Sequence, residues 1–316
     1  MEKKYVVGID VGGQSVKIGI VDRDANILAQ NKFEMSGYGH DDVEKYLNDL
    51  CDNIRELTSD VGMDSIKGIG LGAPNGNYYD GTIVDAVNLP WAKGRTVPVR
   101  KFISENLGLE VTLTNDANAA AIGEMTYGNA RGMKNFIEIT LGTGVGSGIV
   151  IDGRVVYGHD GFAGELGHTT AVRDGRLCGC GRKGCLEAYA SSVGVVRTAR
   201  EMLDSSDEPS LLRGVEKISS KAVYEAAVKG DSIAIEVFKH TGNILGQKFA
   251  DFVTFSAPEA IILFGGVSNA GDLLLNPIRQ SLDENVLNLW KGKVKVLRSG
   301  LPESDAAILG AGALAW

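Results

Sequence analysis

The chain has 316 residues, a formal net charge of −8, and ordinary proportions of hydrophobic (44%) and charged (23%) residues. This length fits two domains or one large one, and it allows a sizeable core without disulfides. The acidic balance, with no basic stripe, argues against nucleic acid or an anionic membrane as a partner. No segment reaches the roughly 18 apolar residues of a membrane span, and the N-terminus shows no secretory signal. We therefore expect a cytoplasmic protein.

The first predicted element is a β-hairpin at residues 6–24, VVGIDVGGQSVKIGIVDRD, in which two apolar runs flank a glycine-rich turn. Glycines let a phosphate approach the backbone and offer it amide hydrogens, and an acid before the turn can hold Mg²⁺. An ordinary hairpin with a glycine-rich turn explains the pattern equally well. The candidate phosphate-side residues are Asp10, Gly12, Gly13, Gln14 and Lys17.

Helical and strand patterns alternate after the hairpin, which predicts an α/β architecture. Apolar residues recur at helical spacing in the first of these segments, and glycine follows two of the predicted helices. The segments are a helix at 41–62, a buried strand at 66–74, a helix at 97–108, and a strand followed by an Ala-rich helix at 110–128.

Asn115 and Asp116 lie at the end of that last strand, the edge at which α/β sheets bind ligands. An exposed aspartate there can accept the proton of a hydroxyl as the hydroxyl attacks a phosphate. The alternative is that Asp116 only caps the helix. We favour catalysis because of the motifs that accompany it.

A second hairpin is predicted at residues 137–154, IEITLGTGVGSGIVIDGR, with the same order of parts as the first. Two such hairpins indicate a duplicated domain. Glycine at alternate positions weakens a strand but exposes amides, which favours a phosphate site at Gly142, Thr143 and Gly144. A P-loop is excluded because its Lys-Ser/Thr ending is absent. A dinucleotide fingerprint is excluded because a strand follows the glycines.

The second half of the chain is mainly helical. Gly265 and Gly266 end a strand in EAIILFGGVSNAG, where a nucleobase or ribose could lie on the backbone. A plain strand–helix turn explains these glycines equally well. A late strand, KVKVLRSGL, is followed by a terminal helix that begins near Asp305.

Three of the four cysteines lie between Cys178 and Cys185, and His168 precedes them. Disulfides are rare in a reducing cytosol, and the C-x-C spacing differs from the C-x-x-C of redox pairs. One imidazole and three thiolates form a filled tetrahedral set that suits structural Zn²⁺. We therefore favour zinc over a disulfide or redox pair. Glu165 and Glu187 flank the set and can accept hydrogen bonds from a polyol.

Together these motifs resemble the ROK family of bacterial sugar kinases and related repressors, in the actin-like ATPase superfamily. The most specific part is E-L-G-H at 165–168, followed by C-G-C-G-x-x-G-C-L-E at 178–187. GIDVGGQSVKIGIV and TLGTGVGSGIV resemble the two phosphate motifs of the family, and LGAPNGNYYDGTIVDAVNLPW resembles its sugar-side loop. The resemblance covers essentially the whole chain.

The resemblance implies a two-lobed α/β fold, the duplicated ribonuclease H-like fold, with a cleft between lobes and a structural zinc loop. We expect one lobe at 1–118 plus 303–316 and the other at 119–302. The implied activity is ATP- and Mg²⁺-dependent phosphorylation of a hexose, normally at the 6-hydroxyl of glucose or a relative, by a homodimer.

The site residues that the resemblance implies fall into four groups. Asp116 matches the general base. Asp10 and Lys17 match the nucleotide side. The matched sugar contacts are Asn115, Glu165, His168 and Glu187, with Asn88 as a further candidate, and the matched zinc ligands are His168, Cys178, Cys180 and Cys185.

Two positions depart from the family pattern. Gln14 replaces the usual threonine of the first motif, which leaves the preferred phosphoryl donor open. Residues 74–77, Pro-Asn-Gly-Asn, replace the usual Pro-Gly pair, which leaves the hexose open. The alternatives are an N-acetylmannosamine, N-acetylglucosamine, allose or fructose kinase, or a non-catalytic sugar-sensing regulator. A zinc hydrolase would need an open metal position, which the fourth ligand fills. Repressors of the family carry an N-terminal helix-turn-helix region, for which the first strand, expected from Tyr5, leaves no room.

Overall fold

The structure is a computed structural model that describes residues 3–316. The chain groups into two compact units, each built from separate segments. Unit 1 contains the described residues up to Gly132, with Val155–Ala163 and Gly300–Trp316. Unit 2 contains Met133–Arg154 and Gly164–Ser299.

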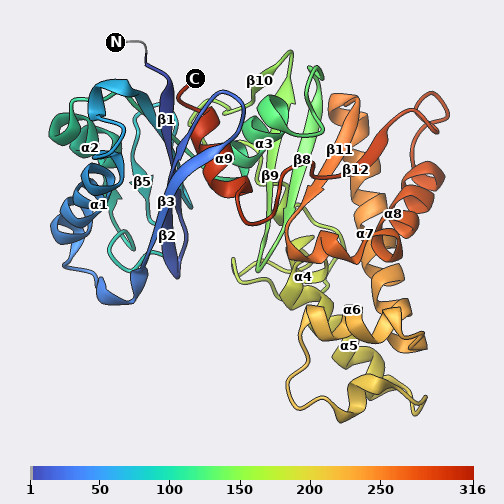
Figure 1. The fold of residues 1–316 in the computed structure, drawn as a ribbon. Helices are drawn as coiled ribbons and strands as arrows, with labels where there is room; N and C mark the ends of the chain where they lie inside the picture. Colours follow the sequence, from blue (N-terminus) through green and yellow to red (C-terminus); the bar gives the residue numbers. More distant parts are fainter. Residues whose placement is uncertain (1–2) are drawn as a thin grey trace. The chain divides into compact units, whose positions relative to one another are not determined.

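Unit 1 is a mixed sheet with helices on both faces. The strand order is β3-β2-β1-β4-β7, in which β1, β2 and β3 are antiparallel neighbours and β4 and β7 continue parallel to β1. Helices α1 and α2 lie beside one face and α9 lies on the other (Figure 1). The elements are β1 (Tyr5–Val11), β2 (Ser15–Val21), β3 (Ile27–Glu34), η1 (Met35–Gly37), α1 (Val43–Thr58), η2 (Met63–Ser65), β4 (Ile66–Gly72), β5 (Ile83–Val84), β6 (Thr96–Val97), α2 (Val99–Leu107), β7 (Val111–Thr114), α3 (Asp116–Tyr127) and α9 (Ala306–Ala313).

Glycines let α9 lie directly on the sheet of unit 1. A Cβ atom added to Gly8 would lie 2.1 Å from the carbonyl oxygen of Ile308, and one added to Gly70 would lie 1.8 Å from that of Ala311. Helix α3 packs closely against α9, because a Cβ on Gly123 would lie 2.7 Å from the Cα of Gly310. This packing places α3 in unit 1, so that the unit extends to Gly132, beyond the boundary expected at residue 118.

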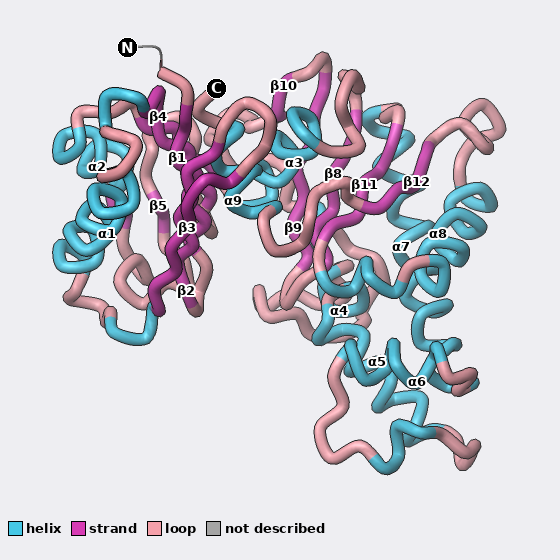
Figure 2. Tube along the Cα trace, in the orientation of Figure 1, coloured by secondary structure: helices cyan, strands magenta, loops and turns pink. Residues whose placement is uncertain are grey.

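Unit 2 repeats the topology of unit 1, with strand order β10-β9-β8-β11-β12. Strands β8 and β9 form an antiparallel hairpin, and β11 and β12 continue parallel to β8. Figure 2 shows the long helix α7 running alongside α8. The elements are β8 (Phe136–Leu141), β9 (Val145–Ile151), β10 (Arg154–Val155), η3 (Leu166–His168), α4 (Glu187–Ala190), α5 (Ser192–Ser205), η4 (Leu211–Gly214), α6 (Ser220–Val228), α7 (Ser232–Ser256), β11 (Ala260–Phe264), η5 (Gly266–Ala270), α8 (Asp272–Asn285) and β12 (Lys295–Arg298).

The shared topology confirms the predicted α/β architecture and the predicted duplication. Both glycine-rich segments form the hairpins expected from their sequence, β1–β2 and β8–β9. Across residues 3–316, no helix combines the length and the apolar character needed to cross a membrane.

Candidate active site

The first glycine-rich turn joins β1 to β2 in unit 1. The Gly12 amide donates to the Ser15 carbonyl at 3.0 Å and closes the turn, whereas Gly13 and Gln14 are exposed. A Cβ on Gly13 would lie 3.1 Å from the carbonyl oxygen of Asn88. The predicted sugar candidate Asn88 therefore packs against the predicted phosphate turn.

Two carboxylates of unit 1, Asp10 and Asp116, have raised pKa values. Asp10 lies at the end of β1, paired across the sheet with Lys17. Burial and, to a smaller extent, the negative charge of Asp116 raise the pKa of Asp10 to about 6, although the charge of Lys17 lowers it. The protein atoms that surround the carboxyl of Asp116 desolvate it enough to raise its pKa, although part of the side chain still faces solvent, and the hydrogen bond from the Ala117 amide lowers it.

Asp116 is the first residue of α3, and its surroundings are compatible with both predicted roles, general base and helix cap. Asn115 is the N-cap of the helix, and its Oδ1 accepts the Ala117 amide at 2.9 Å. Oδ1 of Asp116 accepts the same amide at 2.8 Å, so Asp116 contributes to capping. Asp116 nevertheless remains exposed to solvent, so capping leaves its carboxylate available to a substrate hydroxyl.

The second glycine-rich turn lies between β8 and β9 of unit 2 and contacts the side chain of Glu187. The Gly142 amide donates to the Gly144 carbonyl at 3.1 Å, and the Val145 amide donates to Oε2 of Glu187 at 3.0 Å. A Cβ on Gly144 would lie 2.6 Å from the same oxygen. The absence of a side chain at Gly144 thus lets the Glu187 carboxylate approach this hairpin. The sequence predicted Glu187 only as a sugar contact. Its hydrogen bond with the Val145 amide of the second hairpin was not predicted.

The predicted metal ligands His168, Cys178, Cys180 and Cys185 come together in unit 2, with all their ligand atoms within 4.8 Å of one another. The Sγ atoms of Cys180 and Cys185 are 3.7 Å apart, and Sγ of Cys178 is 3.8 Å from Nδ1 of His168. Tetrahedral zinc with Zn–S bonds of about 2.3 Å separates two sulfur ligands by about 3.8 Å. The donor set and its spacing therefore fit zinc.

The thiols of this cluster differ in their surroundings. Burial raises the pKa of Cys178 to about 12, and a backbone hydrogen bond from Arg182 lowers that of Cys180. Oε1 of Glu187 accepts a hydrogen bond from the Cys178 thiol at 3.3 Å. Glu187 thus contacts both the cysteine loop and the second glycine hairpin.

Arg176, just before the cysteines, is a buried structural residue that the sequence analysis missed. Its guanidinium lies 4.4 Å from the centre of the Tyr189 ring, pairs with Glu201, and donates to the Thr198 hydroxyl at 2.9 Å. These contacts tie the cysteine loop to α4 and α5. No local pattern marks such a residue, because arginine is usually exposed.

Gly265 and Gly266 form the turn between β11 and η5. Gly265 has φ of 94°, and a Cβ there would lie 2.8 Å from the Leu141 carbonyl oxygen. The turn therefore packs against the end of β8, where the second glycine hairpin begins. This arrangement accounts for Gly265 structurally and keeps both glycines beside the predicted phosphate site.

The predicted residues fall into one set in each unit. The unit 1 set is Asp10, Gly12, Gly13, Gln14, Lys17, Asn88, Asn115 and Asp116. The unit 2 set is Gly142, Thr143, Gly144, Glu165, His168, Cys178, Cys180, Cys185, Glu187, Gly265 and Gly266.

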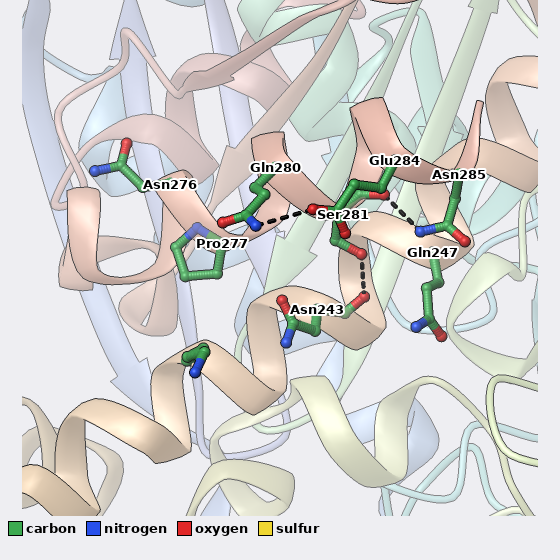
Figure 3. Close-up of a pocket in the computed structure, with 9 residues that line it drawn as sticks. Asn243, Gln247, Asn276, Pro277, Gln280, Ser281, Glu284 and Asn285 are labelled. Carbon is green, nitrogen blue, oxygen red and sulfur yellow. Dashed lines mark hydrogen bonds between the residues drawn. The ribbon is translucent and has the colours of Figure 1, made fainter. Parts of the chain in front are cut away.

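A polar groove of about 320 Å³ lies between α7 and α8 (Figure 3). Amide side chains such as Asn243, Gln247 and Gln280 line it, and the Ser281 hydroxyl donates to the Asn243 carbonyl at 2.8 Å. None of the predicted site residues lines this groove.

A model of the ROK family matches residues 6–316. A glucokinase from Halalkalibacterium halodurans is 36% identical over 319 residues, covering 99% of this chain and 95% of the relative. The crystal structure of a ROK family glucokinase from Streptomyces griseus, in complex with glucose and AMPPNP, has a TM-score of 0.81 and 34% identity over 98% of both chains. The crystal structure of a ROK family transcriptional regulator, a homolog of the E. coli MLC protein, has a TM-score of 0.87 and 28% identity, covering 98% of this chain and 77% of that one. The predicted resemblance is thus confirmed, and the chain belongs to the ROK family.

Proposed function

We propose that the protein is an ATP-dependent hexose kinase that phosphorylates the 6-hydroxyl of glucose or a related hexose. One observation carries the proposal: Asp116 is exposed at the end of β7, although it also helps to cap α3. The neighbouring carboxylate of Asp10 and the first glycine hairpin belong to the same unit. The similarity to the glucokinases of Halalkalibacterium halodurans and Streptomyces griseus supports the choice of substrate.

In this proposal Asp116 accepts the proton of the attacking hydroxyl. Its raised pKa suits a general base, because proton transfer is most effective when the pKa approaches the working pH. Asp10, Lys17 and the amides of the first hairpin face the phosphates. Magnesium, when bound beside Asp10, neutralises phosphate charge. The nucleotide also contacts Gly142, Thr143 and Gly144 of the second hairpin, and Gly265 and Gly266 of the β11–η5 turn.

The proposed hexose contacts are Asn88, Asn115, Glu165, His168 and Glu187. Nδ1 of His168 lies 3.8 Å from Sγ of Cys178, so Nε2 is the nitrogen left for a hexose hydroxyl in this proposal. Zinc held by His168, Cys178, Cys180 and Cys185 has a structural role in this proposal. It fixes the loop that presents His168 and Glu187.

We further propose that the protein acts as a cytoplasmic homodimer and does not bind nucleic acid. The substrate alternatives are N-acetylmannosamine, N-acetylglucosamine, allose and fructose. A sugar-sensing regulator is a second candidate, which the similarity to the ROK transcriptional regulator favours. The exposed Asp116 and the two glycine hairpins weigh against it, since a regulator has no need of a general base.

The test is an initial-rate measurement of ADP release with ATP and each of glucose, mannose, allose, fructose and the N-acetylhexosamines. We expect the highest kcat/KM with glucose. Asp116→Asn should lower kcat by at least about 10²-fold while it keeps the fold, because an asparagine oxygen can still accept the Ala117 amide. A wild type that phosphorylates no hexose, or an Asp116→Asn variant with full activity, contradicts the proposal.

A further inference from the structure

Val145 is the first residue of β9 and directly follows the proposed nucleotide turn at Gly142–Gly144. Both of its backbone polar groups contact segments that carry proposed hexose contacts. Its amide donates to Oε2 of Glu187 at 3.0 Å. Its carbonyl oxygen would lie 2.0 Å from a Cβ atom added to Gly167, so the backbone of the E-L-G-H motif lies directly on it. One buried residue thus touches both segments.

The E-L-G-H motif is attached to β9 at a second point, Ser147. Oγ of this buried serine accepts the Leu166 amide at 3.2 Å and donates to the Gly164 carbonyl. Side chains alternate along a strand, so Val145 and Ser147 lie on the same face of β9. The motif is therefore fixed to this face, beginning at the first residue after the nucleotide turn.

Helix α4 is attached to the same turn at both of its ends. It begins at Glu187, whose carboxylate holds the first amide of β9. Just after its end, the Ser192 amide donates to the Gly142 carbonyl at 2.8 Å. Just before its start, the Leu186 amide donates to the Thr169 carbonyl at 2.9 Å. The segments around His168 and Glu187 are therefore joined to each other and to the turn, all within unit 2.

Glu187 can hold the turn and a hexose at the same time. A carboxylate has two oxygens with about four acceptor positions, and the Val145 amide uses one of them. The half-buried side chain keeps its other acceptor positions for hydroxyl groups. A hydrogen bond to a charged acceptor is also stronger than one between neutral groups, so this contact suits the transmission of order between the two sites.

We propose that Glu187 is a positioning residue that couples hexose binding to nucleotide binding within unit 2. This inference rests on the proposed function and extends it. A hexose that engages Glu187 and the E-L-G-H motif holds Val145, and with it the nucleotide turn, in place. The nucleotide then binds to a turn that is already ordered, which gives positive coupling. The coupling is reciprocal, so the nucleotide tightens hexose binding by the same factor.

The test measures the Kd of glucose and of AMPPNP by calorimetry, each alone and with the other at saturation. In the wild type, each ligand should lower the Kd of the other at least about fivefold. In Gly144→Ala the new methyl group displaces the flexible end of Glu187 from the Val145 amide. The coupling factor should then fall below about twofold. The Kd of glucose without nucleotide should rise about threefold, because a change in the nucleotide turn reaches the hexose through Glu187.

Gly142→Ala is the matched control, since it changes the same turn and its methyl group would meet nothing within 4 Å. Neither Gly142 nor Gly144 has a left-handed φ, so alanine fits the backbone at both positions. Gly142→Ala should keep both the coupling factor and the glucose Kd of the wild type.

Amide hydrogen exchange at Leu166 gives a readout that needs no hexose. Because Ser147 of β9 holds this amide, AMPPNP should slow its exchange about threefold in the wild type and leave it unchanged in Gly144→Ala. Equal coupling in both proteins, no coupling in a wild type that binds both ligands, or an equal effect of AMPPNP on both exchange rates overturns the proposal. A wild type that phosphorylates no hexose refutes the proposed function, and the exchange rate at Leu166 alone then decides whether the turn and the E-L-G-H motif are coupled.

Discussion

Asp10→Asn should stabilise the protein, although it replaces a residue that we place in the nucleotide site. The pKa of Asp10 rises from 3.8 to about 6 in the folded state, mainly through burial and then through Asp116. Because the folded pKa exceeds the unfolded one, ionisation destabilises the fold. The destabilisation is absent below about pH 4 and complete above about pH 7.

The shift of about two units corresponds to at most about 3 kcal/mol at 1.36 kcal/mol per unit, and screening by solvent reduces it because Asp10 is only partly buried. Asparagine has nearly the same shape and no charge to desolvate. The free energy of unfolding of Asp10→Asn should therefore exceed that of the wild type by about 1–3 kcal/mol at pH 7.5, and the difference should approach zero near pH 4.

The assay is urea unfolding of both proteins between pH 4 and 8, followed by tryptophan fluorescence in buffer without added magnesium. The difference between the two proteins removes the contributions of all other carboxylates. Asp60→Asn, at an exposed position of the same unit, is the control and should give a difference that is small at every pH. An Asp10→Asn variant that is less stable than the wild type at pH 7.5, or a difference that does not vary with pH, refutes the reasoning.

Three further predictions concern the cysteine loop, the second hairpin and the packing of α9. Cys180→Ser should lose most of its zinc in an elemental analysis and melt at a lower temperature, whereas full metal content would rule out this ligand. Gly144→Ala should lower kcat/KM for ATP about threefold, because the methyl group would displace the Glu187 carboxylate from the Val145 amide. Shortening that acid in Gly144→Ala/Glu187→Asp should recover part of the loss, and no recovery would contradict the contact. Gly70→Ala should destabilise unit 1 by about 3 kcal/mol or more in urea unfolding, because its Cβ would overlap the backbone of α9. Gly37→Ala, which meets nothing within 4 Å, is the matched control.

Local patterns predicted the parts of this molecule that depend on neighbouring residues. The apolar runs around Gly12–Gly13 and Gly142–Gly144 predicted both hairpins, and alternating helices and strands predicted the duplicated α/β fold. The cysteine spacing, read with His168, predicted a ligand cluster that the structure brings together. These signals succeed because turn chemistry, amphipathic period and donor type are properties of short segments.

Contacts between distant segments left no comparable signal. Nothing in the sequence around Tyr157 indicates that its ring stacks on that of Tyr78. The hydrogen bond from Val145 to Glu187 likewise joins residues far apart in the chain. The expected boundary at residue 118 also differs from the grouping of unit 1, because the packing of α3 on α9 depends on the full fold.

The position of α9 also sets the order in which the two units can be completed during synthesis. Unit 2 has all of its segments once Ser299 has left the ribosome, whereas unit 1 still lacks α9. Until then Val6 and Val21, which α9 covers with Ile308 and Leu309, have no partner from that helix. The unit whose first segments are translated first is therefore also the unit whose last helix is translated last. Until α9 is made, the apolar side chains on this sheet face lack its cover, and exposed apolar surface of this kind is what chaperones bind.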